Sequence, residues 1–370
     1  MKELAIKPEI FSFDTCKEFC EEFGIGEGDL IITNEYIYNP YFTDLGVKAD
    51  VLYQEKYGAG EPSDEMAEAM YADMKGDYKR IIAIGGGTII DISKIFALKN
   101  VSPILDLYDR KVEIAKDKEL ILVPTTCGTG SEVTNIAILE LKSRHTKLGL
   151  AVDEMYADSA VLIPELLKGL PFKFFATSSI DALIHALESS LSPKATPYTE
   201  MFGYKAIEMI LKGYQEIAKN GQEARIPLLK DFLIASNYAG IAFGNAGCAA
   251  VHAMSYPLGG TYHVPHGEAN YALLIGIFKA YMEIDPNGKI KKLNKFIADI
   301  LGCGEDVVYD EMEKLLNQII QCKPLHEYGV KQEELDTFTD NVMEKQGRLM
   351  ANNYVELSRD KVYEIYSRLY

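Results

Sequence analysis

The first part of the chain alternates short apolar runs of the β type with stretches of helical spacing. The β-type runs cover residues 30–33, 49–53, 80–86 and 119–126. Between them, residues 63–75 and 89–99 place apolar side chains at helical intervals. This alternation predicts βαβ units, and hence an α/β fold with a parallel sheet covered by helices on both faces.

Long helical patterns replace the β-type runs from about residue 165 onward. They include residues 181–191, 198–220 and 333–350, with few β-branched runs. A chain of 370 residues is also too long to fold around one ordinary hydrophobic core. We therefore predict an α/β domain of residues 1–172 and an all-helical domain of residues 173–370, with a hinge at residues 170–174.

Residues 232–251 carry no charge over a length that is enough to cross a bilayer. The polar side chains of Ser236, Asn237 and Asn245 favour a buried helical hairpin instead. The N-terminus has acidic residues and a proline where a secretory signal has an apolar run, which predicts a cytoplasmic protein.

The 38 basic and 55 acidic side chains give a formal net charge of −17. This charge repels nucleic acid and anionic lipid at long range, so neither is an expected partner. The six cysteines lack CxxC spacing, which suggests neither a disulfide framework nor a thiolate zinc site.

Two Gly- or Thr-rich turns follow predicted strands. Gly85, Gly86 and Gly87 precede a helix that opens with Thr88 and carries Asp91. Such a turn lets a backbone approach a phosphate, although glycines also serve tight strand-to-helix turns for geometry alone. The second turn, PTTCGTGSEVTN at residues 124–135, follows another apolar strand. Together the two turns favour a Rossmann-like, dinucleotide-binding domain.

Asp181 and His185 stand four residues apart in an apolar helical stretch and so share one helix face. One interpretation is that Ser178 or Ser179 caps the helix and Asp181 lies in its first turn, where the helix dipole contributes about 0.3–1 kcal/mol. A buried carboxylate needs a cation instead. No Lys or Arg lies between residues 173 and 194 to supply one.

Two further histidines, His252 and His266, follow in apolar surroundings. A lone histidine of this kind is usually a hydrogen-bonded core residue. Three of them with one aspartate favour a metal, and this set of three nitrogens and one oxygen suits Fe²⁺ or Zn²⁺ with a position left for substrate.

Four segments carry a family resemblance: GGGTIIDISK (85–94), PTTCGTGSEVTN (124–135), SSIDALIHALES (178–189) and AVHAMSYPLGGTYHVPHGEAN (250–270). In these the sequence resembles the iron-containing (group III) alcohol dehydrogenase family over nearly its full length. The resemblance implies a homo-oligomer that binds NAD and one divalent metal, usually Fe²⁺. It implies that the metal ligands are Asp181, His185, His252 and His266. It places Gly85, Gly86 and Gly87 at the pyrophosphate with Thr88 and Asp91 near the same loop, Thr125, Thr126 and Ser131 along the nucleotide, and Lys147 at the ribose.

Two of the departures from the family pattern concern the predicted site. Where many NAD-preferring members have Asp, this chain has Asn34 followed by Glu35, and Glu35 is a candidate to bind the ribose hydroxyls and favour NAD over NADP. Four residues after His252, where many members have a second histidine, it has Tyr256, and His263 lies nearby. Either Tyr256 or His263 relays the proton from the alcohol, or Tyr256 only packs.

The resemblance implies that a metal-bound primary alcohol passes a hydride to NAD and becomes an aldehyde, in a cleft between the domains. The residues 54–66, 240–247, 262–271 and 351–359 most resemble members that convert 4-hydroxybutyrate to succinic semialdehyde. Candidates to bind the substrate carboxylate are Arg144, His145 and His263, and the alternative for Arg144 and His145 is that they are solvent-facing loop residues. The alternatives are a butanol, 1,3-propanediol or lactaldehyde type of the same group, a glycerol dehydrogenase or dehydroquinate synthase-like enzyme, and a nucleotide-binding regulatory protein with a structural metal.

Overall fold

The computed structural model describes residues 2–144 and 146–370. Contacts divide the chain into two units. One consists of Ile6–Leu170, and the other of residues 2–5 together with Pro171–Tyr370. The sequence placed this division between residues 172 and 173. Residues 2–5 belong to the second unit because the backbone N–H and C=O of Ala5 both bond to the Asn245 side chain, at 2.7 and 3.0 Å.

The first unit contains a six-stranded parallel sheet in the order β1-β8-β5-β4-β2-β3 and a separate antiparallel pair, β6 and β7. The strands are β1 (Glu9–Ser12), β2 (Asp29–Thr33), β3 (Asp50–Tyr53), β4 (Arg80–Gly85), β5 (Glu119–Pro124), β6 (Ile136–Leu141), β7 (Thr146–Ala151) and β8 (Ser159–Leu162). The helices are α1 (Cys16–Phe23), α2 (Glu35–Tyr41), α3 (Asp64–Ala72), α4 (Gly87–Phe96) and α5 (Ile104–Tyr108).

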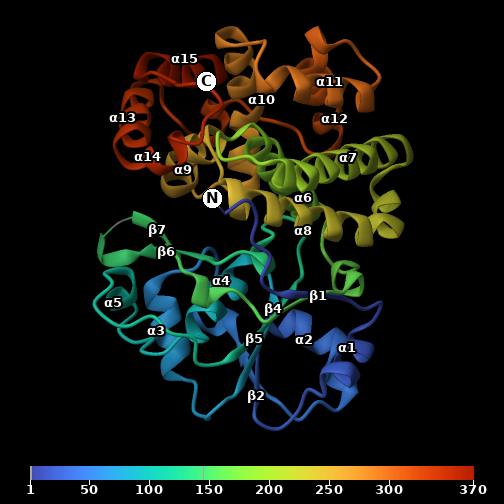
Figure 1. The fold of residues 1–370 in the computed structure, drawn as a ribbon, viewed down its shortest axis with the longest axis vertical. Coiled ribbons are helices and arrows are strands. Elements are labelled where there is room, and N and C mark those ends of the chain that lie inside the picture. The colour runs from blue at the N-terminus through green and yellow to red at the C-terminus, as the bar shows by residue number, and fades with distance from the viewer. Residues whose placement is uncertain (1, 145) are drawn as a thin grey trace. The chain divides into compact units, whose positions relative to one another are not determined.

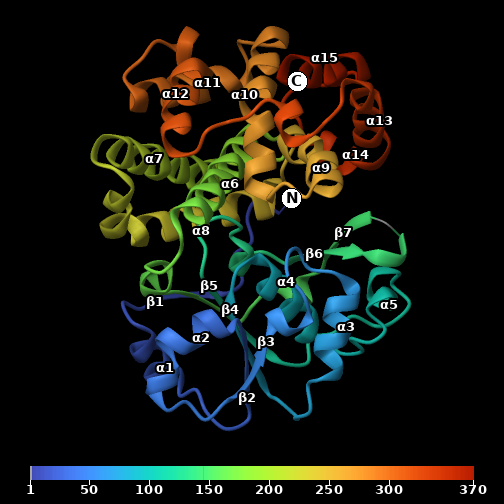
Figure 2. The same cartoon turned by 180° about the vertical axis from the view of Figure 1, so that it is seen from behind.

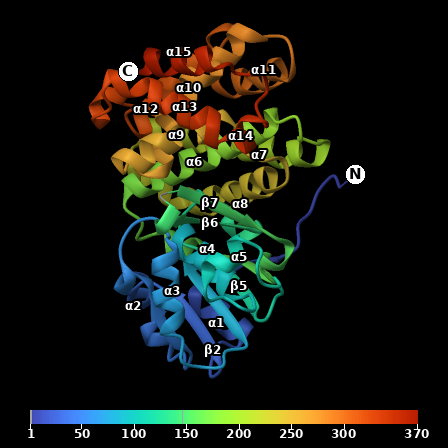
Figure 3. The same ribbon diagram turned by 90° about the vertical axis from the view of Figure 1, so that its left-hand side faces the viewer.

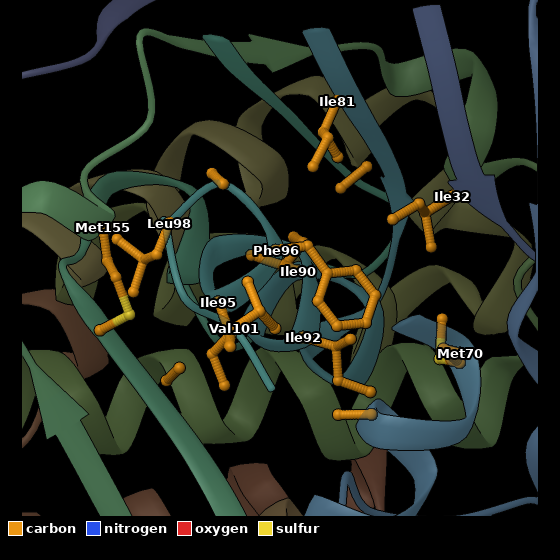
Figure 4. Close-up of a cluster of buried hydrophobic side chains, with 14 of the residues drawn as sticks. Ile32, Met70, Ile81, Ile90, Ile92, Ile95, Phe96, Leu98, Val101 and Met155 are labelled. Carbon is orange, nitrogen blue, oxygen red and sulfur yellow. The ribbon is translucent and has the colours of Figure 1, made fainter. Parts of the chain in front are cut away.

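Helices cover both faces of this sheet. In Figures 1 and 2, α1 and α2 lie on the side opposite to α3, α4 and α5. The central strands are therefore apolar almost throughout, and Ile81, Ile82, Ala83 and Ile84 of β4 are fully buried. Side chains of β2, β4, α3 and α4 gather in one apolar cluster, in which Figure 4 labels Ile32, Ile81, Met70 and Phe96. The predicted α/β class is confirmed.

The second unit is helical. Its helices are α6 (Phe172–Leu191), α7 (Pro197–Asn220), α8 (Leu229–Ala246), α9 (Ala250–Tyr262), α10 (His266–Ile284), α11 (Lys289–Leu301), α12 (Val308–Ile319), α13 (Leu335–Lys345), α14 (Gly347–Met350) and α15 (Arg359–Leu369). Helices α6, α7 and α8 pack on one another, and α10 contacts both α6 and α9 (Figure 3). The predicted all-helical C-terminal part is confirmed.

The uncharged stretch at residues 232–251 consists of most of α8 and the start of α9, and the two helices are separated by a short turn. Within the described ranges, we find no helix long and apolar enough to traverse a bilayer.

Candidate functional site

Helix α6 carries Asp181 and His185 near its centre. It begins at Phe172, so Asp181 is not in a first turn, and the interpretation of a helix capped by Ser178 or Ser179 is wrong. Both serines lie inside α6 and donate their hydroxyls to the Phe175 carbonyl, at 3.1 and 2.8 Å. Asp181 is 3 % exposed and therefore needs positive partners.

Helices α9 and α10 bring His252 and His266 to this carboxylate. Asp181 Oδ1 lies 3.6 Å from His252 Nε2 and 3.7 Å from His266 Nε2. One ligand atom from each of the three residues lies within 4.8 Å of the other two. These atoms are therefore spaced as ligands of one ion, because metal bonds of about 2.0–2.2 Å at tetrahedral angles put two ligands about 3.4 Å apart.

His185 stands beside this group. Its Nδ1 lies 4.0 Å from Asp181 Oδ2, and its ring is stacked between those of Phe243 and His252, with centroid distances of 4.2 and 4.6 Å. The structure thus brings all four predicted metal ligands together, and three of them share the tighter spacing.

The donor atoms fit a divalent metal. His252 Nε2 is buried and has no hydrogen-bond partner among the described residues, since 3.6 Å to Asp181 is too long for a hydrogen bond. A buried, unpaired imidazole nitrogen of this kind suits metal ligation. Burial acts to raise the pKa of Asp181, but the surrounding imidazoles hold it well below its usual value. The carboxylate is therefore ionised, as a ligand must be.

Glu188, which the sequence reasoning missed, holds His252 from α6. Its Oε2 accepts a hydrogen bond from His252 Nδ1 at 2.6 Å, and its two oxygens also accept the N–H groups of Ala249 and Val251. A carboxylate that accepts from Nδ1 leaves Nε2 as the metal-binding nitrogen. The sequence did contain a signal for Glu188, because residues 181, 185 and 188 recur at helical spacing and so lie on one helix face.

Asn270 was also missed. Its Nδ2 donates to Asp181 Oδ1 at 2.8 Å and lies 3.2 Å from His266 Nε2. It is one helical turn beyond His266 in α10, so the spacing pointed to it.

Cys248 is a further neighbour. Its sulfur and one ring nitrogen each of His185 and His252 lie within 4.8 Å of one another. Burial raises the pKa of the Cys248 thiol, although His252 acts to lower it. No sequence pattern indicates this contact, because no other cysteine lies near Cys248 in the chain.

Gly267 allows α10 to approach α6 closely. A Cβ at this position would lie 2.0 Å from the Thr177 carbonyl oxygen, well inside van der Waals contact. The glycine after His266 therefore sets the distance between the helices that carry His266 and Asp181.

In the α/β unit, the two glycine- and threonine-rich turns that were predicted to bind the dinucleotide lie side by side. Gly85 ends β4 and pairs with Pro124 at the end of β5, and the Thr125 N–H donates to the Gly85 carbonyl at 3.1 Å. A Cβ on Gly87 would come within 3.1 Å of the Thr129 methyl group. Gly86 is the N-cap of α4, so the first N–H groups of this helix open at the carboxyl edge of the sheet.

Asp91 and Ser131 connect these turns. Asp91 Oδ1 accepts the Ser131 hydroxyl at 2.5 Å, and its Oδ2 accepts the Ile138 N–H at 3.0 Å. The fully buried Lys94 ammonium donates to Ser131 and Thr134 at 2.5 and 3.1 Å. Burial lowers the pKa of Lys94, although Asp91 acts to raise it. Asp91 and Ser131 thus fix the loops, and their contact with a cofactor stays a prediction.

The other predicted cofactor residues lie around the same edge. Thr88 donates its hydroxyl to the Gly60 carbonyl at 3.2 Å, Lys147 forms an ion pair with Glu61, and Thr126 is half-buried. Asn34 and Glu35 follow β2, where Asn34 is buried and Glu35 is exposed.

The candidate relay and substrate residues differ in their surroundings. The Tyr256 ring lies 6.4 Å from that of His266, whereas His263 is exposed at the left-handed C-cap of α9. Arg144 forms an ion pair of 2.7 Å with Asp109. His145 lies outside the described residues.

Comparison with known proteins places this architecture in a family. The model of the iron-containing alcohol dehydrogenases matches residues 11–164, and the model of the C-terminal part of the Fe-containing alcohol dehydrogenase family matches residues 175–370. The chain belongs to the iron-containing alcohol dehydrogenase family. The motif-based assignment to these enzymes is therefore confirmed.

Individual relatives extend this finding. The chain is 56 % identical to the 4-hydroxybutyrate dehydrogenase of Clostridium kluyveri, with both chains covered completely. It is 31 % identical to the long-chain-alcohol dehydrogenase 1 of Geobacillus thermodenitrificans, over 89 % of this chain and 87 % of that one. The crystal structure of a 1,3-propanediol oxidoreductase has the same fold, with a TM-score of 0.86 and 22 % identity over the full length of both chains. So does the sulfoacetaldehyde reductase of Bifidobacterium kashiwanohense, solved in complex with NAD⁺, with a TM-score of 0.86 and 23 % identity over 100 % of this chain and 98 % of that one.

Proposed function

We propose that this chain is a metal- and NAD-dependent dehydrogenase that interconverts 4-hydroxybutyrate and succinic semialdehyde. The observation that carries the proposal is the 56 % identity to a 4-hydroxybutyrate dehydrogenase over the complete length of both chains. The set of imidazoles around the buried Asp181 carboxylate supports it, because alcohol oxidation needs a group that stabilises negative charge on oxygen.

The residues that would hold the metal are Asp181, His185, His252 and His266, and we propose Fe²⁺, with Zn²⁺ as the alternative that the donor set also suits. A divalent ion there supplies Lewis acidity that lowers the pKa of the substrate hydroxyl, and NAD⁺ supplies the hydride acceptor.

The protein's own groups orient the metal ligands and bind the cofactor. Glu188 fixes the His252 ring, Asn270 holds the Asp181 carboxylate, and the N–H groups at the start of α4 offer donors to the NAD pyrophosphate. Oxidation releases the hydroxyl proton, and we assign its transfer to Tyr256, whose ring centroid lies 6.4 Å from that of His266, with His263 as the alternative. Replacing Tyr256 with Phe should then shift the pH profile of kcat, whereas His263→Asn should leave it unchanged.

The test of the substrate compares kcat/KM for 4-hydroxybutyrate and 1-butanol with NAD⁺, followed by NADH absorbance. We expect 4-hydroxybutyrate to be favoured about 100-fold or more, because groups that bind its carboxylate stay unpaired with butanol. Equal values would overturn the assignment of substrate.

The test of the metal uses His266→Ala, with the exposed His326→Ala as its control. We expect His266→Ala to lose turnover and bound metal while it still binds NADH, and His326→Ala to behave as the wild type. Full metal content in His266→Ala would overturn the ligand assignment. The proposal also includes a cytoplasmic homo-oligomer, whose size light scattering measures.

A further inference from the structure

Two residues that lie 21 positions apart in the sequence meet at the carboxyl edge of the parallel sheet. Strands β2 and β3 are parallel neighbours, and their register pairs Thr33 with Tyr53, the last residue of each strand. The residues that follow these ends, Asn34 and Glu55, are consequently brought together. The Asn34 Nδ2 donates to Glu55 Oε2 at 2.9 Å.

The Glu55 carboxylate is fixed at both of its oxygens. While Oε2 accepts from Asn34, Oε1 accepts the backbone N–H of Glu35 at 2.5 Å, the first N–H of α2. Asn34 itself makes no side-chain capping bond to this helix. The carboxylate of Glu55 thus replaces the usual N-cap side chain and gains from the positive end of the helix.

The Asn34 amide is oriented by a second buried group. Gln54 Nε2 donates to the Gly58 carbonyl at 2.9 Å, and its Oε1 accepts from Asn34 Nδ2 at 3.2 Å. Both Asn34 and Gln54 are buried, whereas Glu55 is exposed. The network therefore presents one ordered carboxylate to solvent at the end of β2.

The charge of this carboxylate is not neutralised locally. Among residues 2–144 and 146–370, no Lys or Arg forms an ion pair with Glu55. Burial first, and then the charge of Glu55, raises the pKa of Tyr36. An anionic group approaching this edge would meet a full negative charge.

The position of the Glu55 charge bears on which dinucleotide can bind. Strand β2 is the sheet neighbour of β4, which ends in the Gly85–Gly87 turn. In parallel sheets that bind dinucleotides, an acidic side chain at the end of the strand next to the glycine turn binds the ribose hydroxyls and excludes a 2′-phosphate. Here the end of β2 carries an amide, Asn34, and the nearest fixed acid comes from the next strand.

We propose that Glu55, held by Asn34, is the residue that selects NAD over NADP. This inference rests on the proposed NAD-dependent function and names the group that binds the adenosine ribose of the cofactor. Its carboxylate accepts the ribose hydroxyls and repels the 2′-phosphate of NADP. The adjacent Glu35 contributes its backbone N–H to Glu55 and is not the selecting acid.

The experiment measures dissociation constants of NADH and NADPH by fluorescence, and kcat/KM for NAD⁺ and NADP⁺, in Glu55→Gln and in the neighbouring control Glu35→Gln. We expect Glu55→Gln to raise NADP use relative to NAD by about tenfold or more, because it removes a like-charge contact. Glu35→Gln should keep the wild-type ratio. Glu55→Asp, which retains the charge, should keep the preference for NAD and controls for loss of folding.

The outcomes separate this inference from the proposed function. An unchanged ratio in folded Glu55→Gln, or a larger shift in Glu35→Gln, would overturn the role of Glu55 and leave the dehydrogenase proposal standing. A wild-type protein that prefers NADPH would overturn the role of Glu55 and the proposed NAD dependence, and would leave only the proposed alcohol oxidation standing. Failure of the wild type to bind either cofactor would overturn the proposed function and this inference together.

Discussion

The Glu188 carboxylate and the His252 Nδ1 atom lie 2.6 Å apart and come from two different helices, α6 and α9. The same carboxylate accepts the N–H groups of Ala249 and Val251 at 3.0 and 2.6 Å, which caps the first turn of α9. One buried acidic side chain therefore fixes both the start of α9 and the ring that it presents to the metal position.

We expect Glu188→Gln to weaken metal binding about 10- to 100-fold, because groups that orient a metal-binding histidine contribute on this scale. The amide keeps the size of the side chain but offers one acceptor oxygen to three donors. Titration of metal-free protein with Zn²⁺ or Fe²⁺ measures the change. The control is Glu200→Gln on α7, whose carboxylate pairs with Lys292, and its affinity should match the wild type. Equal affinity in Glu188→Gln would show that His252 needs no partner.

Gly267→Ala should lower both the metal content and the free energy of unfolding. The new Cβ would come 2.0 Å from the Thr177 carbonyl oxygen, so the start of α10 must move away from α6 and carry His266 with it. Overpacking of this kind typically costs about 1–3 kcal/mol. Chemical denaturation and metal analysis measure the two effects.

Gly260→Ala is the matched control. Gly260 lies in α9, and a Cβ there meets nothing within 4 Å. This variant should be neutral or gain about 0.4–1 kcal/mol from the reduced freedom of the unfolded chain. If Gly267→Ala were as stable and as metal-loaded as Gly260→Ala, the close approach of α10 to α6 would not position His266.

The sequence predicted those strands that have long apolar runs. Strands β2, β4 and β5 were identified because buried β-branched residues mark a central parallel strand, and β3 was identified from its apolar run although it lies at the sheet edge. Strand β1 was missed because it is short and mostly exposed at the sheet edge. Strand β8 was also missed, although all four of its residues are buried. In β6, buried and half-buried positions alternate, so its pattern offered a signal that was overlooked.

The sequence predicted those residues of the metal site that recur at helical spacing, or that are metal-binding residue types in apolar surroundings. Asp181 and His185 did so within α6, whereas Cys248 came next to them only through the turn between α8 and α9. The pairing of Asn34 with Glu55 likewise depends on strand register, which the sequence does not reveal. Contacts between distant segments were therefore the part that needed a structure.

Lys94→Met should change how stability depends on pH. Burial lowers the pKa of Lys94 from the usual 10.5. Between the lowered value and 10.5 the unfolded chain still holds a proton that the folded protein has lost, so wild-type stability rises with pH. The free energy of unfolding of the wild type, relative to Lys94→Met, should therefore increase by up to about 1.4 kcal/mol per pH unit in that window.

Urea denaturation at several values from about pH 7 to pH 10 measures this difference. Because both proteins share their tyrosines, other alkaline titrations cancel. Lys99→Met, which removes an exposed lysine five residues further along, should show no such slope. A constant difference between the wild type and Lys94→Met would mean that Lys94 keeps an ordinary pKa despite its burial.

Removal of the metal should destabilise the helical unit by an amount set by mass action. A ligand present at 1,000 times its dissociation constant adds about 4 kcal/mol to the free energy of unfolding. Without the ion, the buried Asp181 carboxylate accepts a hydrogen bond from Asn270 at 2.8 Å and faces imidazole nitrogens of His252, His266 and His185 at 3.6, 3.7 and 4.0 Å. Wild-type protein should therefore unfold at a lower temperature after chelation and recover when Zn²⁺ or Fe²⁺ returns, whereas His266→Ala should respond weakly to both. If metal shifted the unfolding temperature of the wild type and of His266→Ala equally, the stabilising ion would bind at a site that does not include His266.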